Sequence, residues 1–295
     1  MSDVWRLDLA ALCWEPMPGL PTAVQSHACC AVRGALVVLG GRNQGNPTSS
    51  VELLSKGEDA FVALPPLSCG ALYNAAAFAV DESNSALGQV LLLGGTVVNA
   101  SGMTNTPPSS SMQILDLATG VCTPQPHLRN AEYPFAAATL PDGRVVCAGG
   151  IDPQFVDWTA ARVYGPPEQG VTEFTETVWT WRAMPSLNAA RSMCCGCVMS
   201  DGRFAVLGGM SDGAMSSCEA LSMAGGDGGH WDALPPMHEP RTSFACAAVA
   251  GCIIVAGGLC RNCAEIYDEA LGRWFRLPCK LPHDDWLGAV GYSLI

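Results

Sequence analysis

The chain has 295 residues, of which 49 % are hydrophobic and only 14 % charged, and its net charge is −12. A chain of this length and apolar content buries a large core as one or two folded domains. No stretch approaches the run of about 20 apolar residues that a membrane helix needs, and Asp3, Arg6 and Asp8 interrupt the region where a signal peptide would be apolar. The 15 Lys and Arg are scattered among 27 acidic residues, which excludes a basic stripe for nucleic acid. We therefore expect a globular protein that binds neither nucleic acid nor a membrane.

The 15 cysteines are an odd number in a long chain whose start lacks an export signal. These features favour reduced thiols over a disulfide framework, so we expect a cytoplasmic protein. Cys260 and Cys263, separated by two residues, would supply half of a zinc site, but zinc takes about four ligands and no second pair accompanies them. Cys194, Cys195 and Cys197 fall in a run of small residues, where cysteine acts as a small hydrophobe. We expect ordinary thiols and no metal.

Five β-type runs end in two adjacent glycines. They are, in chain order, LVVLGG at 36–41, VLLLGG at 90–95, VVCAGG at 145–150, FAVLGG at 204–209 and IIVAGG at 253–258. The glycine pairs follow one another at intervals of 54, 55, 59 and 49 residues, the range in which internal repeats indicate propellers or solenoids. Around each pair recur a strand of small residues, a strand with an acidic or tyrosine end, an aromatic position and a proline-bounded exit. Each unit therefore predicts four short strands.

The aromatic position is filled differently in successive units. It holds Phe61, Cys122, Trp179 or Trp181, Trp231 and Trp274. We expect the tryptophans to pack between units, since large rings dominate cores. The Asp-Gly pairs at 142–143 and 201–202 supply the positive φ of a tight hairpin turn, whereas long loops at 96–111 and 151–159 follow a glycine pair. Variable loops gathered at one end of a repeat protein indicate its binding face.

The double glycine, the acidic strand end, the spaced aromatic and the Leu-Pro-Pro exit together resemble the kelch repeat. The likeness covers essentially the whole chain and is strongest in the first, fourth and fifth units. It implies an all-β fold, a six-bladed kelch-type β-propeller with four-stranded antiparallel blades around a central channel. The glycine pairs are then architectural, because they let neighbouring backbones approach closely. We expect one domain, 1–295, with blades at approximately 21–71, 72–128, 129–187, 188–237 and 238–282.

A sixth, composite blade is expected from the two ends of the chain. Residues 1–20 read as the last two strands of a unit, with Trp14 at the aromatic position, and 283–295 read as the first strand. Closure of this kind removes two free strand edges, which would otherwise favour aggregation. No sixth β-type run ending in a double glycine follows the fifth one, so the second strand of this blade is short, missing or supplied by 292–295.

The residues just before each innermost strand form the candidate binding site. They are Gln25, Ser26, Tyr73, Asn74, Glu132, Tyr133, Arg191, Ser192, Arg241, Thr242, Asp285 and Trp286. In kelch propellers that recognise peptides this position lines the channel mouth, so the resemblance implies partner contacts here, with arginine as a donor fork for a carboxylate. An alternative stays open for Arg191 and Arg241, because a buried arginine is normally paired. Their partners would be Glu219 and Glu265.

We expect a non-catalytic protein–protein interaction module, monomeric in isolation, that presents its channel mouth to a peptide or protein partner of mixed charge. Kelch-like propellers include a copper radical oxidase and a sialic acid epimerase, but their site residues have no counterparts that we can match here. The histidines form no ligand or catalytic pattern and no cofactor is expected; they are His27, His127, His230, His238 and His283. Two alternatives remain, because function lives in sites rather than folds. One is an enzyme or binder acting on a sugar or other small polar molecule in the channel mouth, and the other is a structural or oligomerising propeller.

Overall fold

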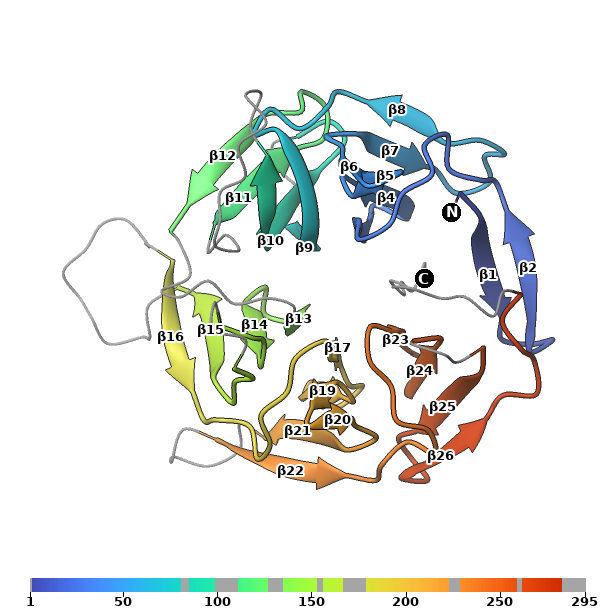
Figure 1. The fold of residues 1–295 in the computed structure, drawn as a ribbon, viewed down its shortest axis with the longest axis vertical. Helices are drawn as coiled ribbons and strands as arrows, with labels where there is room; N and C mark the ends of the chain where they lie inside the picture. The colour runs from blue at the N-terminus through green and yellow to red at the C-terminus, as the bar shows by residue number, and fades with distance from the viewer. Residues whose placement is uncertain are drawn as a thin grey trace.

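The computed structural model describes residues 2–80, 85–98, 111–126, 135–152, 156–166, 179–222, 229–258 and 262–282. Within these ranges the chain forms antiparallel β-sheets arranged as blades around a central axis (Figure 1). The described part contains no helix with the length and apolarity to cross a membrane. The chain is thus an all-β propeller, which confirms the predicted fold class.

Five of the sheets are four-stranded blades. Blade 1 comprises β3 (Ala28–Val32), β4 (Ala35–Leu39), β7 (Val51–Leu54) and β8 (Val62–Leu64). Blade 2 comprises β9 (Ala71–Val80), β10 (Gln89–Val98), β11 (Met112–Asp116) and β12 (Cys122–Gln125). Blade 3 comprises β13 (Ala136–Thr139), β14 (Val145–Ala148), β15 (Ala161–Gly165) and β16 (Thr180–Met184). Blade 4 comprises β17 (Cys195–Val198), β18 (Phe204–Leu207), β21 (Cys218–Ser222) and β22 (His230–Leu234). Blade 5 comprises β23 (Ala245–Val249), β24 (Cys252–Ala256), β25 (Ala264–Asp268) and β26 (Arg273–Arg276).

The predicted count of six four-stranded blades is not what the described residues form. The sector between blades 5 and 1 holds a two-stranded sheet of β1 (Val4–Asp8) and β2 (Cys13–Met17) (Figure 1). The chain lacks a sixth glycine-terminated run from which a second strand would form. The segment 283–295, predicted to add the innermost strand, lies outside the described residues.

The β1–β2 sheet occupies the sixth position of the ring by packing against both neighbouring blades. Trp14 packs against Ala256 and Ala264 of blade 5. On the other side, Val4 and Met17 pack against the buried cluster of blade 1. Burial of these apolar side chains at two interfaces stabilises the closed arrangement.

The glycine pairs lie where consecutive blades meet. Gly40 has a φ of +59°, and a Cβ at this position would lie 2.1 Å from the carbonyl oxygen of Leu72 at the start of blade 2. The next residue, Gly41, donates its N–H to that same oxygen at 2.7 Å. Two further junctions repeat the bond: the Gly150 N–H donates to the Arg191 oxygen at 2.9 Å, and the Gly209 N–H donates to the Arg241 oxygen at 2.8 Å. The glycines are therefore architectural, as the resemblance implies.

Tryptophans of the outermost strands also link neighbouring blades. The indole Nε1 of Trp231 in blade 4 donates to the carbonyl oxygen of Pro185 at 2.7 Å, and that of Trp274 in blade 5 donates to Pro235 at 2.8 Å. Each proline belongs to the exit of the preceding blade. In blades 4 and 5 the aromatic position thus joins blades by burial and by one hydrogen bond, whereas the buried Nε1 atoms of Trp14 and Trp181 have no such partner among the described residues.

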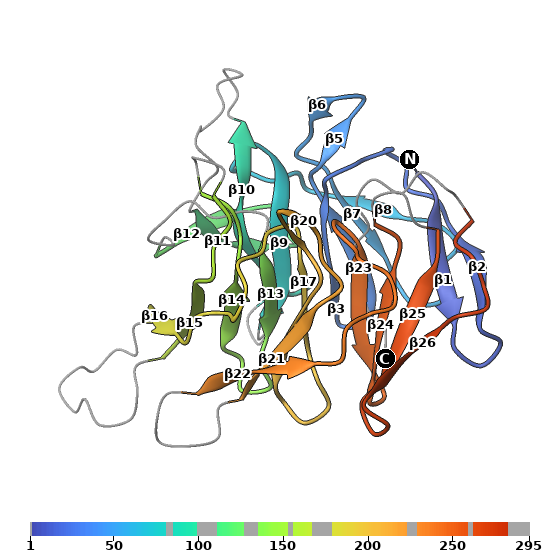
Figure 2. The same cartoon turned by 60° about the horizontal axis from the view of Figure 1, so that its bottom comes forward.

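The two ends of the propeller differ in their connections. The short hairpins β5–β6 (Arg42–Asn43, Asn46–Pro47) and β19–β20 (Met210–Ser211, Gly213–Ala214) follow glycine pairs, and Figure 2 shows β5–β6 projecting beyond the blades at one end. Tight Asp-Gly turns join the first two strands of blades 3 and 4, with φ of +85° at Gly143 and +84° at Gly202. We call the end that carries the two hairpins the mouth face.

Candidate functional site

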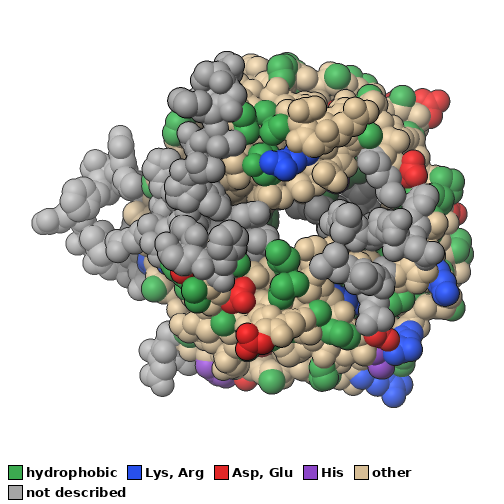
Figure 3. Space-filling view, viewed as in Figure 1, with side chains coloured by type: hydrophobic (Ala, Val, Ile, Leu, Met, Phe, Trp, Pro, Cys, Tyr) green, Lys and Arg blue, Asp and Glu red, His purple; other side chains and the backbone are tan. Residues whose placement is uncertain are grey.

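The innermost strands of the five blades enclose a central channel with a cavity of about 610 Å³. Figure 3 shows its opening at the centre of the molecule. Alanines and cysteines make up most of the lining, because strands that converge on one axis favour small side chains, and Phe78, Phe135 and Phe244 also line it. Among the described lining residues no side chain is charged. The described channel wall is therefore uncharged and largely apolar.

Four non-glycine residues with positive φ lie near the mouth end of the innermost strands, Asn74 within its strand and the others just before theirs. Ser26, Asn74, Met193 and Ser243 have φ between 50° and 59°. Backbone hydrogen bonds connect them across blade junctions, from the Asn74 N–H to the Ser26 oxygen at 2.8 Å and from the Ser243 N–H to the Met193 oxygen at 3.0 Å. A left-handed residue other than glycine costs about 1–3 kcal/mol and persists only where its surroundings impose it. We name these four residues the mouth ring.

Arg191 and Arg241, predicted to contact a partner, instead lie inside their blades with 1 % of their surface exposed. The Arg191 guanidinium donates to the carbonyl oxygens of Gly208 at 2.8 Å and Ser217 at 3.0 Å. It also pairs with Glu219 Oε1 at 2.7 Å. The pairing alternative is thus what the structure shows, and this guanidinium is not offered to a ligand.

Arg241 repeats the same arrangement one blade later. Its guanidinium donates to the carbonyl oxygens of Gly257 at 2.7 Å and Cys263 at 3.0 Å, and to Glu265 Oε1 at 3.0 Å. Burial raises the pKa of the Glu265 carboxyl, but hydrogen bonds from the His238 backbone N–H and from Arg241 outweigh it, so the pKa lies below its ordinary value. We call each arginine–glutamate pair, with its carbonyl acceptors, a blade clamp.

Ser192 and Thr242 are also wrongly placed by the sequence prediction, since both are 2 % exposed. Ser192 forms two backbone hydrogen bonds with Met210, at 2.8 and 2.9 Å. The sequence prediction aligned the units on their glycine pairs and so placed the two arginines at the position of Gln25. The mouth ring shows that Arg191 and Arg241 lie one residue closer to the N-terminus than that position. A one-residue offset in an extended segment turns a side chain to the opposite side, which is why the two arginine side chains point inward.

Gln25, Ser26, Tyr73 and Asn74 do lie together at the mouth, between blades 1 and 2. Gln25 and Ser26 are exposed, whereas Tyr73 and Asn74 are half-buried. Asn74 is one of the channel-lining residues. The remaining predicted residues, Glu132, Tyr133, Asp285 and Trp286, lie outside the described residues.

Arg42 is a mouth residue that the sequence prediction missed. Its backbone pairs with Gln25, through hydrogen bonds of 2.8 and 3.0 Å, and its guanidinium carbon lies 4.0 Å from the centre of the Tyr73 ring. The side chain is half-buried, and the described part of the chain provides no ion pair for it. The sequence feature that could have identified Arg42 is its position directly after the first glycine pair, where the other units carry uncharged residues.

Blade 1 lacks the clamp seen in blades 4 and 5. Glu52 occupies the strand position of Glu219, and Val24 occupies the position of Arg191, two residues before the mouth ring. Glu52 is 4 % exposed, and its Oε2 has no hydrogen-bond partner. Three residues after Val24, burial lowers the pKa of His27 to about 4, so this imidazole is neutral near pH 7. Blade 1 therefore keeps a buried carboxyl group with one oxygen that lacks a hydrogen-bond partner.

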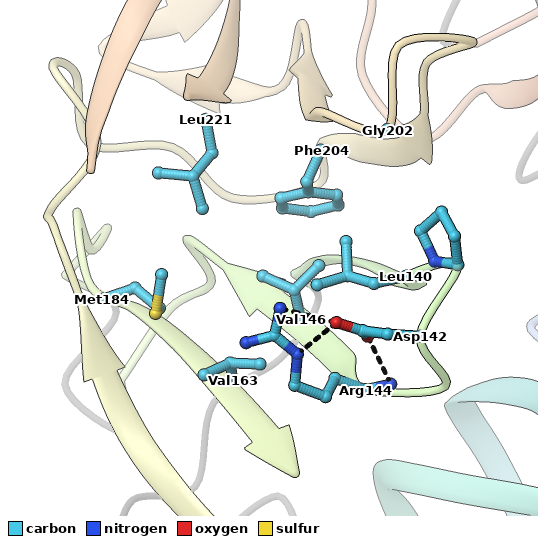
Figure 4. Close-up of a pocket in the computed structure, with 10 residues that line it drawn as sticks. Leu140, Asp142, Arg144, Val146, Val163, Met184, Gly202, Phe204 and Leu221 are labelled. Carbon is cyan, nitrogen blue, oxygen red and sulfur yellow. Dashed lines mark hydrogen bonds and ion pairs between the residues drawn. The ribbon is translucent and has the colours of Figure 1, made fainter. Parts of the chain in front are cut away.

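A smaller pocket of about 180 Å³ lies between blades 3 and 4, beside the two Asp-Gly turns (Figure 4). Leu140, Val146, Phe204 and Leu221 face it, and an ion pair between Asp142 and Arg144 lies at its edge (Figure 4). Its volume is below the range of about 300–1,000 Å³ that is typical of ligand sites. We interpret it as a gap in the packing between blades.

Comparison with known proteins gives three similarities. Residues 25–68 match the kelch motif. An F-box/kelch-repeat protein of Arabidopsis thaliana is 43 % identical over 56 residues, which cover 16 % of this chain and 14 % of that protein. The solved structure of YjhT superposes with a TM-score of 0.73 at 12 % identity and covers 94 % of this chain and 89 % of the YjhT chain. At this identity the structural likeness shows the fold alone.

Proposed function

Because the chain belongs to the kelch-repeat β-propellers, we propose that it is a non-catalytic protein-interaction module. The site is the mouth face between blades 1 and 2, and the ligand is a segment of another protein that carries a carboxylate. The residues that make the contacts are Gln25, Ser26, Arg42, Tyr73 and Asn74, with Met193 and Ser243 across the channel.

The observation that carries this proposal is the state of Arg42. The clamp arginines have their guanidinium groups bonded to glutamate and to carbonyl oxygens inside the blade, whereas Arg42 stacks on Tyr73 at the surface. Stacking on an aromatic face holds the planar fork in one orientation and leaves its edge to bind a carboxylate. A pre-oriented donor loses little entropy on binding, which is a property of binding hot spots.

The mouth ring supports the same assignment. Its strained backbone is tied across blade junctions by hydrogen bonds, so the surface around Arg42 is rigid. A rigid, mainly polar rim around a channel of uncharged walls suits an extended peptide that inserts one side chain. We further propose that the protein acts as a cytoplasmic monomer, consistent with free thiols at every described cysteine.

Completion of the sixth blade belongs to this proposal. We propose that 283–295 adds to the β1–β2 sheet, so that six blades surround the channel. The support is the position of that sheet, which contacts blade 5 through Trp14 and blade 1 through Val4 and Met17. A chain truncated after residue 282 should then melt at a lower temperature than the full chain and self-associate through the exposed strand edge. Unchanged melting and a monomeric truncated chain would contradict closure.

The binding proposal is tested with a displayed library of random peptides. The wild-type chain should select peptides with a shared acidic residue, and Arg42→Ala should bind the selected peptides about 10–100-fold more weakly, the loss of one charge-assisted bidentate contact. Arg273→Ala is the matched control, because Arg273 also stacks on an aromatic ring, at 4.5 Å from Phe275, but on the outermost strand of blade 5. Circular dichroism verifies the fold of each variant.

Two results would overturn the proposal. If the wild type and Arg42→Ala bind the selected peptides with equal affinity, Arg42 makes no contribution to binding and the proposed site is wrong. Failure to select any peptide, combined with a rise in melting temperature on addition of sugars, would favour the small-molecule alternative.

A further inference from the structure

The central channel is large enough to hold part of a ligand, and the chemistry of its wall restricts which part. Its cavity of about 610 Å³ lies within the range of about 300–1,000 Å³ that is typical of ligand sites. Small apolar side chains and the rings of Phe78, Phe135 and Phe244 line it. Such a wall favours the burial of an apolar group, whereas a charged group would lose its hydration and find no counter-charge among the described lining residues.

Two thiols of the channel wall are already hydrogen-bonded to backbone. Cys195 Sγ donates to the Phe244 carbonyl oxygen at 2.8 Å, and Cys246 Sγ donates to the Gly196 carbonyl oxygen at 3.5 Å. Each bond runs between the innermost strands of blades 4 and 5, so these protons are not offered to a ligand. Both cysteines therefore act toward the channel as small apolar groups.

The cavity extends inward from the mouth ring along the innermost strands. Asn74, Met193 and Ser243 of the mouth ring line it, and so do Ala79 and Ala248, which follow Asn74 and Ser243 by five residues. At about 3.3 Å per residue of strand, five residues correspond to a depth of about 17 Å. A large side chain that enters between the mouth-ring residues is therefore buried along its whole length.

The proposed carboxylate site lies at the opening of this channel. Tyr73, whose ring centre lies 4.0 Å from the Arg42 guanidinium carbon, is followed directly by Asn74, which lines the cavity. Consecutive Cα atoms are about 3.8 Å apart, so the residue that orients the cation and the residue that lines the entrance are neighbours. A cation on the rim of an uncharged, largely apolar channel is complementary to a carboxylate with an apolar group close to it.

We propose that the channel selects the partner segment by a large apolar side chain, such as leucine, methionine or phenylalanine, two positions away from the acidic residue that binds Arg42. In an extended segment, side chains two positions apart lie on the same face and about 7 Å from each other. One of them then reaches Arg42 while the other enters the channel. The inference rests on the proposed peptide-binding function and specifies which peptides bind: those with an acidic residue, any residue and a large apolar residue, in either order.

A free hydrophobic carboxylic acid has the same two groups but fits the mouth less well. It would bind Arg42 and the channel wall, yet it would make no use of the exposed polar rim at Gln25 and Ser26. A peptide backbone brings N–H and C=O groups to that rim at every residue. The polar rim therefore favours a protein segment over a free acid.

The test is a selection on the full chain from a displayed peptide library with one fixed glutamate between random positions. The wild type should enrich leucine, methionine or phenylalanine two positions from the glutamate. Alanine in place of that residue in a synthetic copy of a selected peptide should weaken binding about 10–100-fold, the loss of one buried apolar side chain. Bound peptide should also slow the alkylation of Cys246 by N-ethylmaleimide, whereas Cys252, a half-buried thiol that is not among the described lining residues, should react at an unchanged rate.

A channel-filling variant tests the same assignment from the side of the protein. Ala247 is half-buried and lines the cavity, so Ala247→Phe narrows the channel. This variant should lose the preference for leucine over alanine and still bind the alanine peptide as the wild type does, whereas Arg42→Ala should weaken both peptides. Ala270→Phe, in an exposed turn of the same blade, is the matched control and should keep the preference.

The inference is overturned if the leucine and alanine peptides bind the wild type equally, or if bound peptide leaves the alkylation of Cys246 unchanged. Neither comparison needs a protein variant, so both hold even where Ala247→Phe unfolds. Peptides that bind through Arg42 without an apolar preference would leave the proposed function intact and refute the channel assignment alone, whereas a failure to select any peptide would refute both. Protection of Cys246 by 4-phenylbutyrate, combined with no protection by any peptide, would assign the channel to a free hydrophobic acid and overturn the inference.

Discussion

Replacing Arg241 with alanine should lower the free energy of unfolding more than any substitution of an exposed residue, because it removes the buried guanidinium group of a blade clamp. The guanidinium is fully buried and donates to Gly257, Cys263 and Glu265. Without it, the Glu265 carboxylate stays buried with only the donors of the adjacent connector, such as the His238 N–H at 2.7 Å. Breaking a buried pair by removal of one partner costs about 3–5 kcal/mol.

Guanidinium chloride titrations followed by circular dichroism measure this loss in unfolding free energy. Arg276→Ala is the control, since Arg276 pairs with Glu239 at 2.9 Å but its side chain is 63 % exposed, and such pairs contribute about 0–1 kcal/mol. Arg241→Met combined with Glu265→Leu removes both charges and should lose less than Arg241→Ala alone. A loss below about 1 kcal/mol for Arg241→Ala, or a larger loss for the double variant, would refute the clamp.

The pH dependence gives an independent check on the same clamp. The folded-state pKa of Glu265 lies below its ordinary value, so the pair contributes stability above the unfolded pKa of about 4.3. That contribution is lost as the pH falls through the folded pKa. The difference between wild type and Arg241→Ala should therefore be largest near pH 7 and shrink toward pH 3. A difference that grows on acidification would assign the stabilisation to another group.

Two further outcomes follow from the same contacts. Glu52→Gln should stabilise the protein by roughly 1 kcal/mol, because it replaces a buried carboxyl group whose Oε2 has no hydrogen-bond partner, whereas Glu219→Gln should destabilise it by about 3 kcal/mol. Denaturation curves that shift in the same direction for both variants would contradict this. Gly40→Ala should cost several kcal/mol more than Gly45→Ala, because both glycines have positive φ but only the Gly40 Cβ meets a carbonyl oxygen, at 2.1 Å. Equal shifts in melting temperature would exclude the close approach.

The repeat architecture was predictable because its signals are local. A glycine pair after a buried run marks a junction where a Cβ would strike the next backbone, as at Gly40. An Asp-Gly turn fixes a hairpin, and the tryptophan positions mark the outermost strands through Trp231 and Trp274. Each feature depends on a few consecutive residues, so its spacing along the chain translates directly into strand order.

The mouth was predicted only in part because its geometry is not local. Gln25 and Tyr73 come together through the hairpin that follows the first glycine pair, which places Arg42 on the tyrosine ring. No spacing rule reveals that stacking. For Arg191 the sequence allowed either contact with a binding partner or pairing with a glutamate inside the blade. The choice depends on a φ of 50° at Met193, and a methionine, unlike a glycine, does not indicate a positive φ in the sequence.

Blades 1, 2 and 3 depart from the clamp, and the first two carry the proposed site. Blade 1 has Val24 opposite Glu52, blade 2 has Leu72 opposite Gln113, and blade 3 has Arg162 at the glutamate position, where blades 4 and 5 have arginine opposite glutamate. Repeats that keep the arginine–glutamate clamp stabilise the ring, whereas departures from a repeat's own pattern concentrate at functional sites. If blades 4 and 5 stabilise the ring and blades 1 and 2 bind the partner, substitutions should change stability and binding affinity separately. Arg42→Ala then changes affinity without stability, whereas Arg241→Ala changes stability and leaves the mouth chemistry intact.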